Sequence, residues 1–204
     1  LDWTYGRVLC LKLSPSGATW HAEPEVFMSG QGSLGFAPTD LEVGPDGSLY
    51  VCVGGRGTRG GVYRIRAKNT PRVLSEIATA DDCVAALQPL SSWSRARWVP
   101  IAKKLGAAPY IAIAEDEARN DPERIRAIEI VTELFGGLDA PLALRLLKSS
   151  SPLVRAQTMW SCGRTSEKLT PDLLSAALRD RHARVARASL EAAQTWNASS
   201  PWDP

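Results

Sequence analysis

The second half of the chain contains four similar segments at a nearly constant spacing, and this spacing constrains the fold more than any other feature. Aligned on Ser94, Ile125, Val154 and Val185, the segments lie 31, 29 and 31 residues apart. A fixed period near 30 residues indicates a repeat architecture, in which one supersecondary unit stacks on the next. We therefore expect this half of the chain to be a row of similar units.

Each repeat is predicted to be a pair of helices. The aligned segments begin helices, because Ser or Asp is available to cap them and Pro122 and Pro152 stand where a first turn tolerates proline. Glycines mark the ends of these helices, namely Gly106, Gly136, Gly137 and Gly163. Pro100 lies inside the first of them and is expected to kink or stop that helix.

Partner helices are expected between the aligned ones, roughly at Ala108–Ala118, Ala140–Leu147 and Pro171–Leu178. Asp81 and Asp82 are expected to begin the helical part. Four stacked pairs over residues 79–196 would form an α-solenoid, and residues 197–204 would be a tail or linker.

The first part of the chain has a different pattern, in which apolar residues recur at every second position. The predicted strands lie near residues 7–13, 18–28, 40–43, 49–53 and 62–65. Pro24 indicates that the second strand is an edge or bulged strand. A final outer strand is expected near Val73–Ile77. Glycine-marked turns join the strands, which favours an antiparallel meander.

Meanders repeated around an axis form a β-propeller, in which each blade has four strands. Five strands correspond to about one and a half blades, so residues 1–78 are predicted to be the last blades of a propeller. A small sandwich or an isolated antiparallel sheet is the alternative. The predicted fold class is thus α+β and multidomain, a partial β-propeller followed by an α-solenoid of helix pairs.

Charge and cysteine content exclude several classes of protein. The net charge is +2, and 22 acidic and 24 basic residues are interspersed, so we predict no nucleic-acid partner. No apolar run approaches the roughly 20 residues of a transmembrane helix. The four cysteines form no CxxC, which excludes a zinc ribbon and a haem attachment motif from this chain. Cys10 and Cys52 lie in strand-like runs, where buried free thiols or a disulfide between strands are expected.

The candidate ligand-binding residues are two arginines and one aspartate in the predicted blade. Arg56 and Arg59 stand on a glycine-rich loop that permits close approach, and guanidinium groups suit carboxylates. Asp40 begins the innermost strand, where it would face a metal or a polar ligand. The commoner roles of such residues are structural: ordinary loop composition for the arginines and a turn-stabilising hydrogen bond for Asp40. We predict no catalytic residue and no metal ligand, and we interpret His21 and His182 as structural.

The arginines of the aligned helices have two interpretations. Arg95, Arg126 and Arg155 would pair with acidic residues of neighbouring repeats such as Glu129, Glu133 and Asp139. Alternatively, they would line an anion-binding groove.

Several stretches resemble known families. PTDLEVGPDGSLYV and GGVYRI resemble a blade of the six-bladed propellers related to soluble quinoprotein sugar dehydrogenases, and they also resemble NHL-type propellers. Val154-Arg155 resembles the Val-Arg step that opens the second helix of HEAT-like repeats. A propeller end joined to such repeats, with PLSSWSRARW between them, resembles the C-terminal part of membrane-bound dehydrogenases of secreted bacterial proteins.

This resemblance implies a function without a catalytic role for this chain. The chain would be the non-catalytic C-terminal segment of a secreted or periplasmic dehydrogenase-like propeller protein. Its helical array would be a structural and interaction module, whose partner is another protein or further domains of the same one. The alternative is part of an active sugar or alcohol oxidoreductase with catalytic residues in upstream blades. For this alternative, the resemblance implies that the full-length protein binds pyrroloquinoline quinone (PQQ) and that a separate domain carries c-type haem.

Overall fold

The computed structural model describes residues 1–32, 35–55, 57, 60–68, 74–165 and 170–198. Within them the fold is α+β, with a two-stranded and a three-stranded antiparallel sheet and eight helices. The predicted class is therefore confirmed at this level. The chain divides into two compact units: the sheet unit holds most of residues 1–77 with 86–98, and the helical unit holds 78–85 and 99–204 with the short segment 16–19.

The two-stranded sheet is a long hairpin. Strand β1 (Arg7–Ser16) pairs with β2 (Thr19–Ser29), and β2 continues through Pro24 as one strand. Because β2 pairs only with β1 among the described residues, the proline occupies an edge strand, as predicted. Most side chains of both strands are exposed, so the prediction that Cys10 is buried is wrong: it is a free, exposed thiol. Cys52 is free and half-buried.

The three-stranded sheet is the predicted meander. Its strands are β3 (Pro38–Val43), β4 (Leu49–Val53) and β5 (Gly61–Ile65), in the order β3-β4-β5. Both pairings are antiparallel, and Val51 lies opposite Leu41 on one side and Tyr63 on the other. Val51 and Val53 are buried together with Val8. Of the outer strand predicted near Val73–Ile77, residues 74–77 are not a strand, and Val73 lies outside the described residues.

The β3–β4 turn is stabilised by one carboxylate. Asp46 accepts hydrogen bonds from the backbone N–H and hydroxyl of Ser48, from the Tyr50 hydroxyl and from Arg64, whose Nη2 lies 2.5 Å from Oδ2. The hydrogen bond from the Ser48 N–H, with the others, lowers the Asp46 pKa to about 2. The turn predicted from sequence is thus a closed hydrogen-bonded unit.

The helices begin and end close to the predicted positions. They are α1 (Ala80–Val84), α2 (Ser92–Leu105), α3 (Ala108–Glu115), α4 (Asp121–Phe135), α5 (Ala140–Leu146), α6 (Pro152–Cys162), α7 (Pro171–Leu178) and α8 (Ala183–Ala198). Side chains cap five of them, namely Thr79, Asn120, Asp139, Ser151 and Thr170. Gly136 ends α4 in the left-handed conformation. Helix α2 continues through Pro100 to Leu105, so the proline does not stop it.

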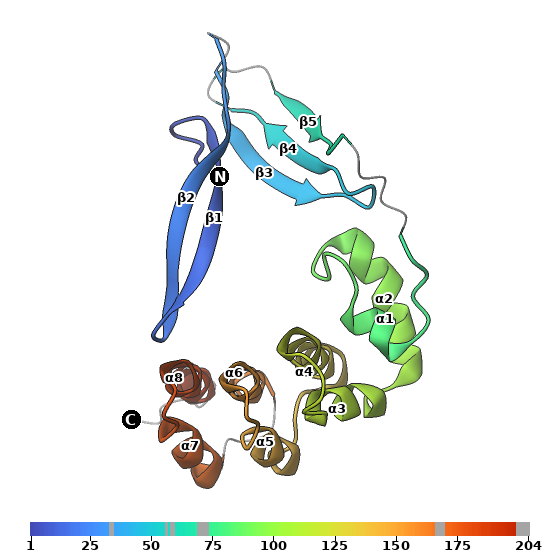
Figure 1. Ribbon diagram of the computed structural model, residues 1–204, viewed down its shortest axis with the longest axis vertical. Coiled ribbons are helices and arrows are strands. Elements are labelled where there is room, and N and C mark those ends of the chain that lie inside the picture. The colour runs from blue at the N-terminus through green and yellow to red at the C-terminus, as the bar shows by residue number, and fades with distance from the viewer. Residues whose placement is uncertain (33–34, 56, 58–59, 69–73, 166–169, 199–204) are drawn as a thin grey trace. The chain divides into compact units, whose positions relative to one another are not determined.

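Helices α3–α8 pack as three pairs. Within each pair the two helices contact each other, and the first helices α3, α5 and α7 contact in order, as do the second helices α4, α6 and α8. Figure 1 shows these as two rows of helices. The side chains of Ile128, Val154, Met159 and Val185 are fully buried in this unit. None of the described helices is long and apolar enough to cross a membrane.

One glycine permits a close approach between the second helices. A Cβ atom at Gly163, at the end of α6, would lie 2.8 Å from the Cα of Ala192 in α8. That distance is shorter than van der Waals contact, so a side chain here would push the two helices apart. Gly163 therefore has a packing role besides ending its helix.

Candidate functional site

The residues predicted to bind a ligand are only partly described. Arg56 and Arg59 lie outside the described residues. Asp40 is exposed in β3 beside Cys52, and its Oδ1 accepts a hydrogen bond from the backbone N–H of Leu41 at 2.8 Å. This is a local bond of the kind expected for a structural carboxylate, and a ligand role for Asp40 stays a prediction.

The arginines of the aligned helices have separate partners. Arg126 pairs with Glu129 of its own helix at 2.9 Å. Arg155 pairs with Asp180 of the next helix pair, and the guanidinium of Arg95 lies 5.5 Å from the centre of the Trp98 ring. For Arg155 the predicted pairing with an acid of a neighbouring repeat is therefore confirmed, with Asp180 as the partner in place of the acids named in the prediction. For Arg126 the predicted partner Glu129 is found, but the prediction of a contact between repeats is wrong, because both residues lie in α4.

A charged pocket in the helical unit is the best candidate site in the described part of the chain. We call it the α3–α5 pocket, because it lies where these two helices end. Its volume is about 430 Å³. It is lined by Glu115, Glu117, Arg124, Arg145, Leu146, Lys148, Ser149 and Ser150. Three cationic and two anionic side chains thus meet at one surface.

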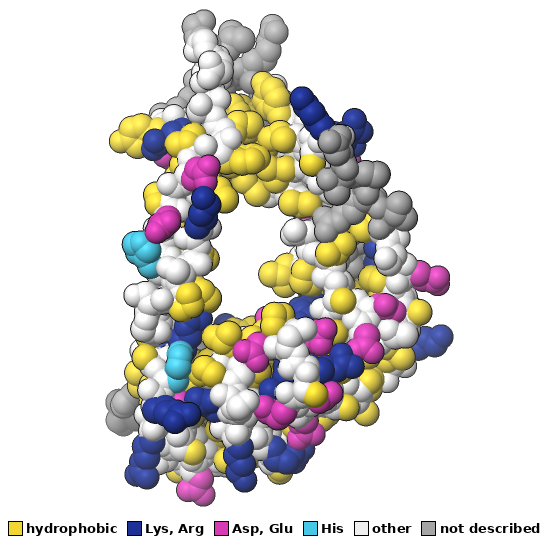
Figure 2. Space-filling view, viewed as in Figure 1, with side chains coloured by type: hydrophobic (Ala, Val, Ile, Leu, Met, Phe, Trp, Pro, Cys, Tyr) yellow, Lys and Arg dark blue, Asp and Glu magenta, His cyan; other side chains and the backbone are white. Residues whose placement is uncertain are grey.

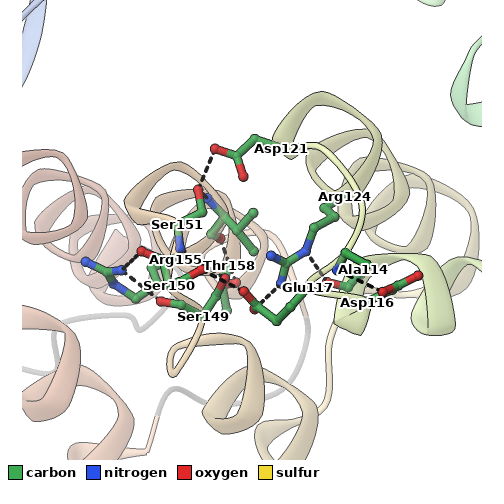
Figure 3. Close-up of polar contacts among 12 residues, drawn as sticks. Ala114, Asp116, Glu117, Asp121, Arg124, Ser149, Ser150, Ser151, Arg155 and Thr158 are labelled. Carbon is green, nitrogen blue, oxygen red and sulfur yellow. Dashed lines mark hydrogen bonds and ion pairs between the residues drawn. The ribbon is translucent and has the colours of Figure 1, made fainter.

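Arg124 is the fixed element of the pocket. It lies in the first turn of α4, its side chain is only 2% exposed, and its Nε donates to the carbonyl oxygen of Ala114 at 2.9 Å. That carbonyl belongs to the last turn of α3, where the final carbonyl oxygens have no backbone N–H donor within the helix. The same guanidinium donates from Nη2 to Glu117 at 2.7 Å (Figure 3). One buried arginine therefore ties the end of α3 to the start of α4.

Glu117 is held by donors from two helix pairs. Besides Arg124, the Ser150 hydroxyl donates to its Oε2 at 2.7 Å (Figure 3). The bond from Arg124 is the main cause, and the serine hydroxyls the next, of a Glu117 pKa lowered to about 2. The carboxylate therefore stays ionised at all ordinary pH values.

Positions 30 residues apart touch each other across the helix pairs. Arg145 in α5 donates from Nε to Glu115 in α3 at 2.5 Å, and the Ser151 hydroxyl donates to Asp121 at 2.7 Å. Both contacts join residues separated by 30 positions. The repeat spacing seen in the sequence thus equals the separation between residues that touch across consecutive helix pairs.

Arg155 makes the corresponding link to the last pair. Its Nε and Nη2 donate to the two carboxylate oxygens of Asp180 at 2.7 and 3.0 Å. Its Nη1 donates to the carbonyl oxygens of Ser149 and Ser150 at 2.9 and 3.2 Å. Both charged side chains are nearly buried, with 9% and 13% exposed. The Arg155 bonds lower the pKa of Asp180.

The lining of the pocket is suited to recognising charge, because it combines three cationic and two anionic side chains. A hydrogen-bonded hydroxyl–carboxylate pair of the lining is Ser150 with Glu117, and a carboxylate with a pKa lowered to about 2 is a weak base. Within the described residues no group of three or more His, Cys, Asp or Glu could hold a metal ion. On the face shown in Figure 2, acidic and basic side chains are intermingled over the helices.

The sequence pattern did not identify this pocket. Glu117 and Lys148 stand in the loops between the helices of a pair, where helical periodicity carries no information. One signal was available, because Glu115 and Arg145 have opposite charges at equivalent positions of consecutive repeats. Comparison of the chain with known protein families, with curated proteins and with solved structures finds no match.

Acid is expected to destabilise the helical unit through Glu117. A carboxyl group with a lower pKa in the folded state contributes stability above its unfolded pKa, and this contribution is lost as the pH falls. For Glu117 the window runs from about 4.5 down to about 2. Because half of the side chain is exposed, we expect only about 1 kcal/mol from it.

Urea unfolding at a series of pH values would measure this effect. Glu117→Gln should flatten the loss of stability between pH 4.5 and pH 2. Glu76→Gln, which changes an exposed carboxyl group in the sheet unit, should leave that loss unchanged. An unchanged profile in Glu117→Gln would contradict the prediction.

Proposed function

We propose that this chain is the non-catalytic C-terminal segment of a secreted, dehydrogenase-like β-propeller protein, and that its helical unit is a HEAT-like module for structure and protein interaction. The observation that carries the proposal is the contact between equivalent residues of consecutive helix pairs, Glu115 with Arg145 and Asp121 with Ser151. Such nearest-neighbour contacts are the basis of an α-solenoid. Solenoids present extended surfaces, which favours a binding role over catalysis.

The sheet unit supports the propeller part of the proposal. The meander β3-β4-β5 has the strand order of a blade, and the hairpin β1–β2 has the form of two strands of another. Several large apolar side chains of these strands are exposed, including Leu11, Leu13, Val26 and Phe27. An isolated two-stranded hairpin is marginally stable, so further strands of a longer protein would complete it. On this proposal the protein is periplasmic or secreted, as the sequence resemblance implies.

A second candidate function rests on the arginine-bearing loop of the sheet unit. Under this second hypothesis the chain belongs to a working quinoprotein oxidoreductase. PQQ then binds to Arg56 and Arg59, and c-type haem lies in a separate domain. The chemical support is the match between guanidinium groups and a tricarboxylate cofactor. Replacing both arginines in the full-length protein should then weaken PQQ binding, and unchanged affinity would reject this role.

An oxidoreductase assay tests the first proposal. The purified chain is incubated with PQQ, calcium, a sugar or an alcohol and an artificial electron acceptor. We expect no reduction of the acceptor above the rate without protein. Turnover that depends on both PQQ and substrate would overturn the non-catalytic assignment.

A further inference from the structure

We propose that the α3–α5 pocket binds a side-chain carboxylate of an acidic segment in a partner protein. The inference rests on the proposed interaction function and assigns it a place and a chemistry. Its starting point is a surplus of hydrogen-bond donors in a pocket whose own carboxylates are already occupied.

Both carboxylates of the pocket are engaged by the protein itself. Glu117 accepts from Arg124 and Ser150, and Glu115 accepts from Arg145. Neither would need a cationic ligand to be satisfied. The pocket is therefore unsuited to a cation, although two acidic side chains line it.

The cationic side chains are only partly engaged. Arg145 uses Nε for Glu115, and its other two nitrogens have no hydrogen bond among the described residues. Its side chain is 56% exposed. Lys148 is exposed, and within the described part of the chain its ammonium group has no ion pair. These two side chains supply the unused donors.

The charge balance selects the kind of anion. Among the lining residues, Arg124, Arg145 and Lys148 against Glu115 and Glu117 leave one net positive charge, which Asp139 near Arg145 partly offsets. One carboxylate neutralises that charge, whereas a phosphate dianion would leave an excess of negative charge beside two glutamates. A forked guanidinium with an adjacent ammonium group suits a carboxylate or a phosphate, so the preference for a carboxylate rests on the charge balance. The site opens at the surface of an array that we propose to bind proteins, which favours a peptide side chain as the source.

Replacing Lys148 is the most direct test of the proposal. It makes no ion pair among the described residues, so its replacement should leave the fold intact. Binding is measured by fluorescence anisotropy with the full chain and a labelled peptide of alternating Glu and Gly residues, at fixed low salt. We expect the Glu peptide to bind and a matched Gln peptide not to bind. Lys148→Glu should weaken binding about tenfold or more, because it places a like charge against the ligand.

The controls separate the pocket from general electrostatic attraction. Lys148→Arg should retain binding, and Lys104→Glu, which changes an exposed lysine at the end of α2 by the same charge, should change it little. Equal losses in Lys148→Glu and Lys104→Glu would overturn the assignment. Acetate binding as tightly as the peptide would assign the pocket to a free carboxylate, and tighter binding of inorganic phosphate would reject a single carboxylate.

Failure of this inference can be told apart from failure of the proposed function. If the Glu peptide does not bind and the oxidoreductase assay is also negative, the pocket assignment is wrong while the non-catalytic role stands. If the acceptor is reduced, the proposed function fails whatever the peptide does.

Discussion

Replacing Arg155 with alanine is expected to lower the free energy of unfolding of the helical unit by about 3–5 kcal/mol, because the change leaves Asp180 as an unpaired, nearly buried charge. The same change frees the carbonyl oxygens of Ser149 and Ser150 from their Nη1 donor. Arg155 is thus the only side chain found to join both the α5–α6 loop and the α7–α8 loop within the described residues. Urea unfolding followed by circular dichroism at 222 nm measures the loss.

Two further variants identify the cause. Arg155→Lys keeps the charge but cannot reproduce the paired bonds to both oxygens of Asp180, so we expect it to recover only a part of the stability. Arg181→Ala removes an exposed arginine next to Asp180 and should change stability by less than about 0.5 kcal/mol. A wild-type midpoint for Arg155→Ala would show that this ion pair does not stabilise the unit.

The helix pairs could be predicted from sequence because their signals are local. Proline in a first turn, a capping side chain and a helix-ending glycine all lie within a few residues of the boundary that they set. The start of α6 shows this, since Ser151 caps the helix that Pro152 begins. A repeat period adds to these signals, because each boundary is expected again about 30 residues later.

The pocket could not be predicted in the same way, because it depends on distant contacts. Glu117 meets Ser150 only when one helix pair stacks on the next, and the stacking geometry is not encoded in either loop. Charge pairing within one helix, such as Arg126 with Glu129, is visible at a spacing of three residues. Arg155 with Asp180 has no such mark. The prediction that Cys10 is buried is wrong for a related reason. Alternating apolar residues predict that one face of a strand is covered, but they do not identify the element that covers it.

Truncating Trp98 is expected to be the most damaging change in the sheet unit. The indole of Trp98 is fully buried, and its Nε1 donates to the carbonyl oxygen of Pro89 at 3.0 Å. Trp98→Ala should cost about 3–5 kcal/mol, because it removes a large apolar surface and leaves a cavity. It also leaves the Pro89 carbonyl without its indole donor. Urea unfolding monitored by circular dichroism avoids the change in fluorescence that losing a tryptophan causes.

A graded series separates the contribution of packing from that of the hydrogen bond. Trp98→Phe keeps much of the buried ring but loses the N–H donor, so we expect a smaller loss of about 1–3 kcal/mol. Leu90→Ala, at an exposed position of the same unit, should change stability by less than about 0.5 kcal/mol. If Trp98→Phe were as damaging as Trp98→Ala, the hydrogen bond to Pro89 would dominate. Equal, small effects of all three variants would mean that Trp98 is not in the core of this unit.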